Sequence, residues 1–132
     1  MFDLYIYPFG VQKGKEIFQL AGYYVGNAPR RAARTRVSDL IVIRFTPISH
    51  LNPINETFLN SLIEKASDEY FKTSGPITTC SKKTADFINE GLVRYNLSQK
   101  QPLTGFLQIL VIRENDLFII QTGASSVFLL TK

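Results

Sequence analysis

The chain has 132 residues, of which 45% are hydrophobic and 20% are charged, with 10 Phe and 6 Tyr. This length suits one domain with a sizeable core, and the composition excludes an intrinsically disordered chain. A single cysteine, Cys80, excludes an intrachain disulfide and is compatible with a reducing, cytoplasmic location.

The apolar runs do not favour a membrane-spanning or secreted protein. Arg44 and Arg113 interrupt the longest runs, and Met1-Phe2-Asp3-Leu4 lacks the basic start and long apolar core of a signal peptide. We therefore expect no membrane segment in this chain. Residues 1–132 are expected to form one domain, and a strand-like final run is compatible with the N-terminal portion of a longer protein.

Three strands are predicted before the middle of the chain. Residues 2–9 are rich in aromatic and β-branched residues, and residues 16–25 carry Phe18 and Leu20 with alternating spacing. Residues 26–36 have no apolar periodicity and predict a loop. The continuous apolar run at residues 39–45 predicts a strand that is covered on both faces.

The middle of the chain predicts two helices. Apolar residues recur at helical spacing from Phe58 to Tyr70, with Asn55 as the N-cap and Gly75-Pro76 as the stop. A second helix is predicted to begin after Thr78 or Thr79, and its apolar stripe includes Gly91. Glycine disfavours a helix interior by about 1 kcal/mol relative to alanine, which suggests close packing there.

The last third predicts a three-stranded antiparallel meander. Its strands are residues 105–113, 117–122 and 126–131, with a polar turn after the first and a second turn at Gly123. The element order is therefore β-β-β-α-α-β-β-β. Because strands and helices are segregated, we expect an α+β fold, a layered β-sandwich with a helix pair.

Few residues suggest chemistry on their own. His50 is the only histidine, and no cysteine lies near it, so a zinc site is not indicated. Neither phosphate-binding glycine pattern, GxxxxGK or GxGxxG, is present. Cys80 lies near a helix start, but a buried structural thiol is the simpler interpretation.

The net charge of +4 comes from one cluster of arginines, Arg30, Arg31, Arg34 and Arg36. Without these four residues the basic and acidic residues balance. Guanidinium groups match phosphate and carboxylate well, so the cluster is a candidate anion site. No aromatic residues are interleaved for base stacking, which makes nucleic acid a less favoured ligand. Asp39 is a candidate cation ligand, or simply a partner for Arg34 or Arg36.

Three segments together carry a family resemblance. They are Tyr95-Asn96-Leu97, the apolar run of residues 104–111, and residues 116–130 with their turn Gly123-Ala124-Ser125-Ser126. In order and spacing, residues 22–130 resemble the metal-dependent type 2C protein phosphatases. The segment from Arg34 to Asp39 resembles that family's Arg-x-x-Asn-Glu/Gln-Asp motif, of which the first Arg and the last Asp are kept.

The resemblance implies a phosphate contact at Arg34, a metal network at Asp39, and two metal ions that activate a water. The departures from the family pattern are as informative. The family's Gly-Asp-Ser-Arg turn has Ala124 in place of its aspartate, and Thr46-Pro47 stands where an Asp-Gly pair would follow the strand. One aspartate cannot hold two metal ions.

The leading hypothesis is therefore a catalytically inactive, type 2C phosphatase-like domain with a regulatory or protein-interaction role. It has no catalytic residues and no cofactor, and a vestigial metal ligand at Asp39. One alternative is an active magnesium or manganese phosphatase completed by residues downstream of Lys132. Another is an anion-binding or nucleic-acid-binding module that uses Arg30 to Arg36, and a third is a small α+β sensor or scaffold of another topology. A protein partner is expected, with a homodimer through an edge strand as one form.

Overall fold

The computed structural model describes residues 4–18, 20–48, 55–128 and 130. A short hairpin, β1 (Gly10–Gln12) and β2 (Lys15–Ile17), comes first, and β3 (Tyr23–Asn27), the 3-10 turn η1 (Arg34–Arg36) and β4 (Asp39–Pro47) follow. Two helices come next, α1 (Glu56–Lys72) and α2 (Ile77–Asn96). The last elements are β5 (Gly105–Arg113) and β6 (Asp116–Thr122).

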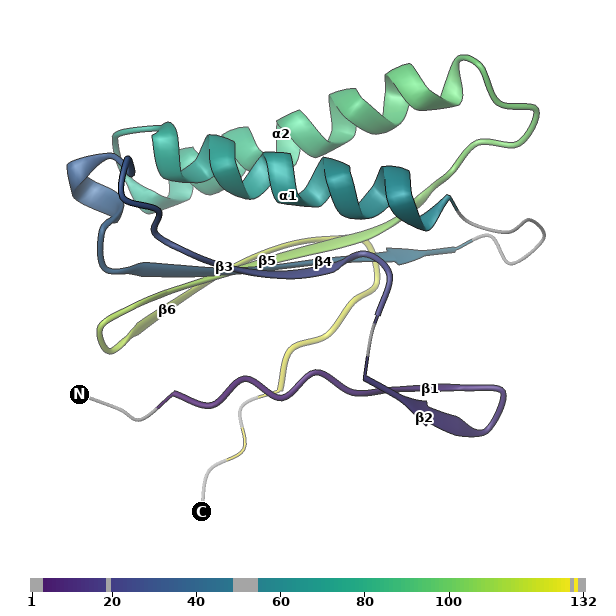
Figure 1. Ribbon diagram of the computed structural model, residues 1–132, viewed down its shortest axis with the longest axis horizontal. Coiled ribbons are helices and arrows are strands. Elements are labelled where there is room, and N and C mark those ends of the chain that lie inside the picture. Colours follow the sequence, from purple (N-terminus) through teal and green to yellow (C-terminus); the bar gives the residue numbers. More distant parts are fainter. Residues whose placement is uncertain (1–3, 19, 49–54, 129, 131–132) are drawn as a thin grey trace.

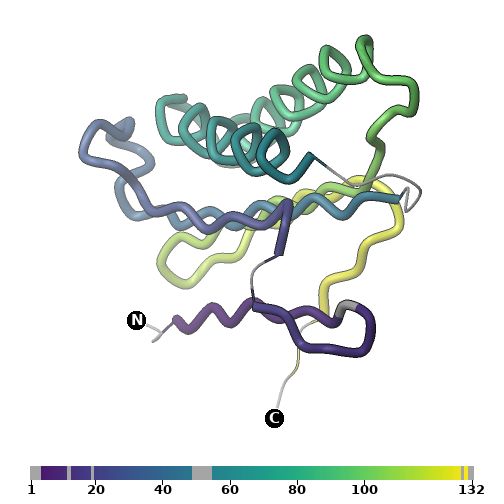
Figure 2. The backbone as a smooth tube through the Cα atoms, turned by 45° about the vertical axis from the view of Figure 1, so that its right-hand side comes forward, coloured from purple at the N-terminus to yellow at the C-terminus, as the bar shows by residue number. Residues whose placement is uncertain are grey.

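The larger sheet has the order β3-β4-β5-β6 and is antiparallel throughout. Both helices cover one of its faces, α1 against β3 and β4 and α2 against β5 and β6 (Figure 1). The segment before β3, with its two-stranded sheet, lies on the opposite side of the large sheet (Figures 1 and 2). The predicted α+β class, with layers of sheet and a helix pair between strands, is confirmed.

The core lies between the helices and the two central strands. Alternate residues of β4 point toward the helices and are buried, namely Ile41, Ile43 and Phe45. The opposite face is covered only in part, because Val42 is buried but Arg44 is exposed and Leu40 is half-buried. The prediction that this strand is covered on both faces was therefore too strong, since only the helix face is fully buried.

The helices follow the sequence pattern closely. The Asn55 side chain accepts a hydrogen bond from the Phe58 backbone N–H at 2.9 Å, which confirms the predicted N-cap. α2 begins at Ile77, earlier than predicted, because Pro76 takes the N-cap position where no backbone N–H is needed. A Cβ on Gly91 would lie 2.4 Å from a methyl carbon of Leu62, so the suggested close approach of the helices at this glycine is confirmed.

Strand boundaries near the ends of the chain differ from those expected. Residues 4–9 of the first predicted strand form no strand, and residues 16–25 divide into β2 and β3. Gly22, with φ of +76°, lies between them and redirects the chain toward the large sheet.

The C-terminal meander has two strands instead of three in the described residues. Residues 126–128 and 130 form no strand. Gly123, with φ of +77°, turns the chain out of the sheet, and the Ser126 carbonyl then accepts a hydrogen bond from the Gln108 side chain at 3.3 Å. The tail therefore passes over the open face of β5 and does not extend the sheet.

Candidate functional site

Asp39 is the centre of a buried polar cluster at the start of β4, and only 3% of the residue is exposed. Arg113, its register partner at the end of β5, donates to both carboxylate oxygens, from Nε at 2.6 Å and from Nη2 at 2.9 Å. The Tyr70 hydroxyl of α1 donates at 2.7 Å and Arg36 Nη1 at 3.3 Å. Asp39 thus pairs with Arg36, which was one of the partners anticipated for it, and with Arg113, which was not anticipated.

Arg36 is completely buried, which is rare for an arginine. Besides Asp39, its guanidinium donates to the backbone carbonyls of Thr35, Thr73 and Gly75. Its Nη2 lies 2.8 Å from the Cys80 sulfur, and its Cζ lies 5.1 Å from the centre of the Tyr70 ring. Cys80 is a buried free thiol in this cluster. Arg36 therefore joins η1 to the end of α1 and the start of α2.

Burial and hydrogen bonding act in opposite directions on the carboxyl of Asp39. Burial by itself would raise its pKa, but the hydrogen bonds from Arg113 and Tyr70 and the two nearby guanidinium charges lower the pKa below its ordinary value. Burial, and then the hydrogen bond to Asp39, raises the pKa of Tyr70. Asp39 is therefore held as a carboxylate, with its oxygens already occupied by donors.

The other three arginines of the predicted anion site are not part of the Asp39 cluster. Arg30, Arg31 and Arg34 are exposed, whereas Arg36 points into the interior. Their loop is attached to α1 by a 2.7 Å hydrogen bond from the Ala33 N–H to the Phe71 carbonyl. The arginine cluster of the sequence is therefore divided in space into three solvated side chains and one buried side chain.

Gly123-Ala124 and Asp39 lie at opposite ends of the large sheet. Asp39 is paired with Arg113, and Arg113 with Asp116, whereas Pro47 is paired with Gly105 and Leu107 with Thr122. The distance along β4 from Asp39 to Pro47 is roughly 26 Å at about 3.3 Å per residue. Thr46-Pro47 and Gly123-Ala124, where the family resemblance would place carboxylates, thus share one sheet end, and Asp39 lies at the other.

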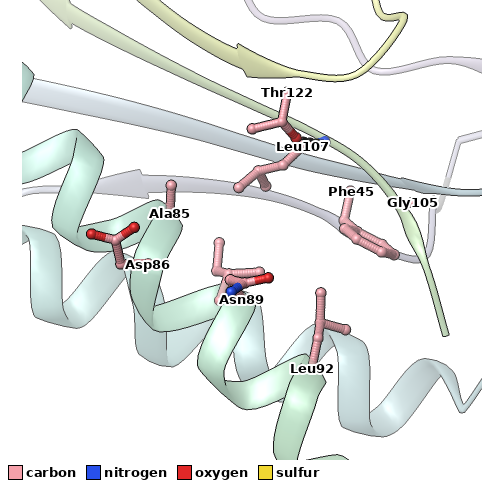
Figure 3. Close-up of a pocket in the computed structure, with 9 residues that line it drawn as sticks. Phe45, Ala85, Asp86, Asn89, Leu92, Gly105, Leu107 and Thr122 are labelled. Carbon is pink, nitrogen blue, oxygen red and sulfur yellow. Dashed lines mark hydrogen bonds between the residues drawn. The ribbon is translucent and has the colours of Figure 1, made fainter. Parts of the chain in front are cut away.

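A cavity of about 290 Å³ lies at the sheet end near Gly123. Its lining residues come from α2 and from the ends of β4, β5 and β6, and they are Phe45, Ala85, Asp86, Ile88, Asn89, Leu92, Gly105, Leu107 and Thr122 (Figure 3). Asp86 is the only carboxylate among them, and it forms a 2.9 Å ion pair with Lys82. Apolar side chains dominate this cavity, so it resembles a packing surface more than a metal site.

Within the described part of the chain, no group of three or more histidine, cysteine, aspartate or glutamate side chains is arranged to hold a metal ion. No helix among the described residues is long and apolar enough to cross a membrane. His50 lies outside the described residues.

Comparisons of the chain with protein-family models, with curated proteins and with solved structures found no match. The likeness to type 2C phosphatases therefore depends only on the residues and spacings quoted above.

Two members of the Asp39 cluster were missed from the sequence. Arg113 had been noted only as a charge interrupting an apolar run, and Tyr70 only as part of a helix face. The sequence does place an arginine at the end of an apolar strand next to a hairpin turn, where it could pair with a carboxylate on a neighbouring strand. To identify Asp39 as that carboxylate one must know the strand register, since Arg113 is 74 positions from Asp39.

Proposed function

We propose that this chain is a catalytically inactive domain, similar to the type 2C phosphatases, that acts in regulation by binding another protein. Its single cysteine is buried and free, which suits a reducing compartment such as the cytoplasm. The domain needs no metal or other cofactor in this role.

One observation carries the proposal. At the sheet end where the resemblance calls for metal-binding carboxylates, the residues are Thr46, Pro47 and Ala124. The one motif aspartate that is kept, Asp39, is at the opposite end and is neutralised by Arg36 and Arg113. A metal ion at Asp39 would have to displace both guanidinium groups, and the described residues place no group of three metal-binding side chains around it.

An interaction role has support from the face of the sheet opposite the helices. Leu117 and Ile119 of β6 are exposed there at 48% and 42%, and half-buried Leu110 and Ile112 of β5 continue the same apolar face. Exposed apolar surface on a folded domain commonly marks a binding site. The partner is a protein, and a second copy of this chain bound through an edge strand is one form of it.

The direct test is hydrolysis of an aryl phosphate and a phosphopeptide with Mn²⁺ or Mg²⁺, combined with calorimetric titration of both ions. We expect neither turnover nor saturable binding, and the same null result for Asp39→Asn. Metal-dependent turnover that Asp39→Asn abolishes would contradict the proposal and favour the active-phosphatase alternative.

A second candidate function, anion binding, has one observation in its favour. Arg30, Arg31 and Arg34 are exposed on one short loop, and none of the ion pairs formed among the described residues uses them. Binding of heparin or a single-stranded oligonucleotide should then weaken with salt and be lost when all three arginines are changed to glutamate. The matched control changes Lys82, Lys83 and Arg94 of α2, and unchanged binding in the loop variant would remove this candidate.

A further inference from the structure

β6 is an edge strand without the usual protection. Its outer side pairs with no other strand among the described residues. From Leu117 to Thr122 it contains no charge, proline or glycine, and its pairing with β5 is continuous, without a bulge. Monomeric proteins usually protect such edges with charges, prolines or bulges, because an open apolar edge pairs with other chains.

No other strand in the described part of the chain covers this edge. After Gly123 the tail turns away beneath the sheet, where the Ser126 carbonyl meets the Gln108 side chain of β5 (Figure 1). The opposite edge is different, because β3 has only five residues and contains Gly26, whose position lies against the Ser67 hydroxyl of α1. β6 is therefore the longer of the two edges, and it contains no glycine.

We infer that β6 pairs antiparallel with β6 of a second copy of this chain, with Ile119 on the two-fold axis, to form one continuous eight-stranded sheet. This inference rests on the proposed interaction role and names the partner. An isologous contact of this kind requires the same strand to complement itself.

The register follows from the β5–β6 hairpin. Arg113 and Asp116 close a two-residue turn, and in such hairpins the closing pair exchanges both backbone hydrogen bonds. The backbone groups of every second residue then point outward, and these residues are Leu117, Ile119 and Gln121. Centring the pair on Ile119 is the register that overlaps the whole of β6.

In that register the side chains are compatible on both faces. Phe118 lies opposite Ile120 of the partner on the helix face, which is a favourable aromatic and β-branched pair. Ile119 lies opposite its own copy on the open face. Asp116 lies opposite Thr122, so no like charges meet along the strand.

α2 supplies a second contact. It covers β5 and β6, so two copies would bring their α2 helices to roughly 10 Å, the usual spacing of packed helices. Gly91 and Tyr95 face α1, which leaves Ala85, Asn89 and Leu92 on the opposite flank. Those three residues line the apolar cavity (Figure 3), and the second copy would close its open side.

The first test is sedimentation velocity over a wide concentration range. We expect a reversible dimer for the unaltered chain and a monomer for Ile119→Lys, with circular dichroism showing that the variant is folded. Val37→Lys is the matched control, since it places the same charge on an apolar loop residue that is 67% exposed, and it should keep the dimer. A monomer at every concentration, or a dimer that Ile119→Lys leaves intact, overturns the inference.

The second test fixes the register without depending on a destabilised variant. Directly opposed residues of a hydrogen-bonded pair have Cα atoms about 5.5 Å apart, within disulfide range. Under mild oxidation Ile119→Cys should therefore form a covalent dimer. Leu117→Cys, whose copies would be roughly 13 Å apart, should not, and Cys80 is buried in both variants. Equal cross-linking of the two variants contradicts the Ile119-centred pairing.

Failure of this inference and failure of the proposed function give different results. A strictly monomeric chain without metal-dependent hydrolysis overturns only the dimer and leaves a different protein as the partner. Metal-dependent hydrolysis overturns the inactive-domain proposal, whatever the oligomeric state.

Discussion

The carboxylate of Asp39 shows how one residue can change its meaning between sequence and structure. A carboxylate beside an arginine-rich loop suggests a cation site, but here it accepts hydrogen bonds from two arginines and a tyrosine. Its charge is balanced by side chains from η1 and β5, and Tyr70 adds α1. The residue is therefore best understood as a structural junction at one end of the sheet.

Replacing Asp39 by asparagine should destabilise the fold by about 3–5 kcal/mol, the range for breaking a buried ion pair. The loss is large because Arg36 would stay buried without its counter-charge. Urea unfolding followed by circular dichroism measures it. Asp86→Asn is the control, since it removes an exposed ion pair with Lys82 and should change stability by less than about 1 kcal/mol. Similar losses for both variants would contradict this role of Asp39.

The ion pairs of Asp39 also determine how the unfolding free energy should depend on pH. The pKa of Asp39 is lower in the folded protein than its ordinary value. Its contribution is therefore complete above the unfolded-state pKa, about 3.9, and is lost as the pH falls through the lower folded-state value. Unfolding free energies measured from pH 6 downward should fall more steeply below about pH 4 for the unaltered chain than for Asp39→Asn. Parallel curves would show that Asp39 is not responsible.

At the scale of elements, Gly91 sets the distance between the two helices. A Cβ there would meet Leu62, so Gly91→Ala should destabilise the protein by about 1–3 kcal/mol through overpacking. This exceeds the gain of about 1 kcal/mol in helix propensity. In a Leu62→Ala background the same change should become stabilising, because the space is then free. Thermal unfolding of the four proteins measures this change of sign, and a loss in both backgrounds would place the clash elsewhere.

The helices were easier to predict from the sequence than the strands, because helices depend on local patterns and strands depend on pairing between distant residues. Helix patterns are local, so the N-cap and the apolar face of α1 were predicted nearly to the residue. The start of α2 was predicted a few residues too late, because the helix begins directly after Pro76. The strand expected at residues 126–131 is absent from the described residues 126–128 and 130, because an apolar run does not reveal whether a turn such as Gly123 keeps the chain in the sheet. The candidate site divides in the same way. The pairing of Asp39 with Arg36 spans three positions, whereas the pairing with Arg113 requires the register of β4 and β5.

At the scale of the whole molecule, the layers differ in how firmly they are held. The helices and central strands enclose a continuous core, whereas Tyr5, Tyr7 and Phe9 before β1 are exposed. Stability against local opening follows such differences in burial. The face of the large sheet opposite the helices therefore carries a second layer that contributes little to the core.

Amide hydrogen exchange tests this difference and the pairing of β6 together. Amides of β4 and β5, which have strands on both sides, should exchange at least about a hundredfold more slowly than those of β1 and β2. The outward amides of Leu117, Ile119 and Gln121 should be protected at high protein concentration and exposed on dilution. Among the described residues no strand pairs with them on that side, so their protection would come from the second copy. Val25 of β3 serves as the comparison at the other edge, and its exchange should not depend on concentration. Equal protection of β1 and β4 would mean that the N-terminal layer unfolds together with the core. If the exchange of the outward β6 amides did not change with protein concentration, the proposed pairing of two β6 strands would be contradicted.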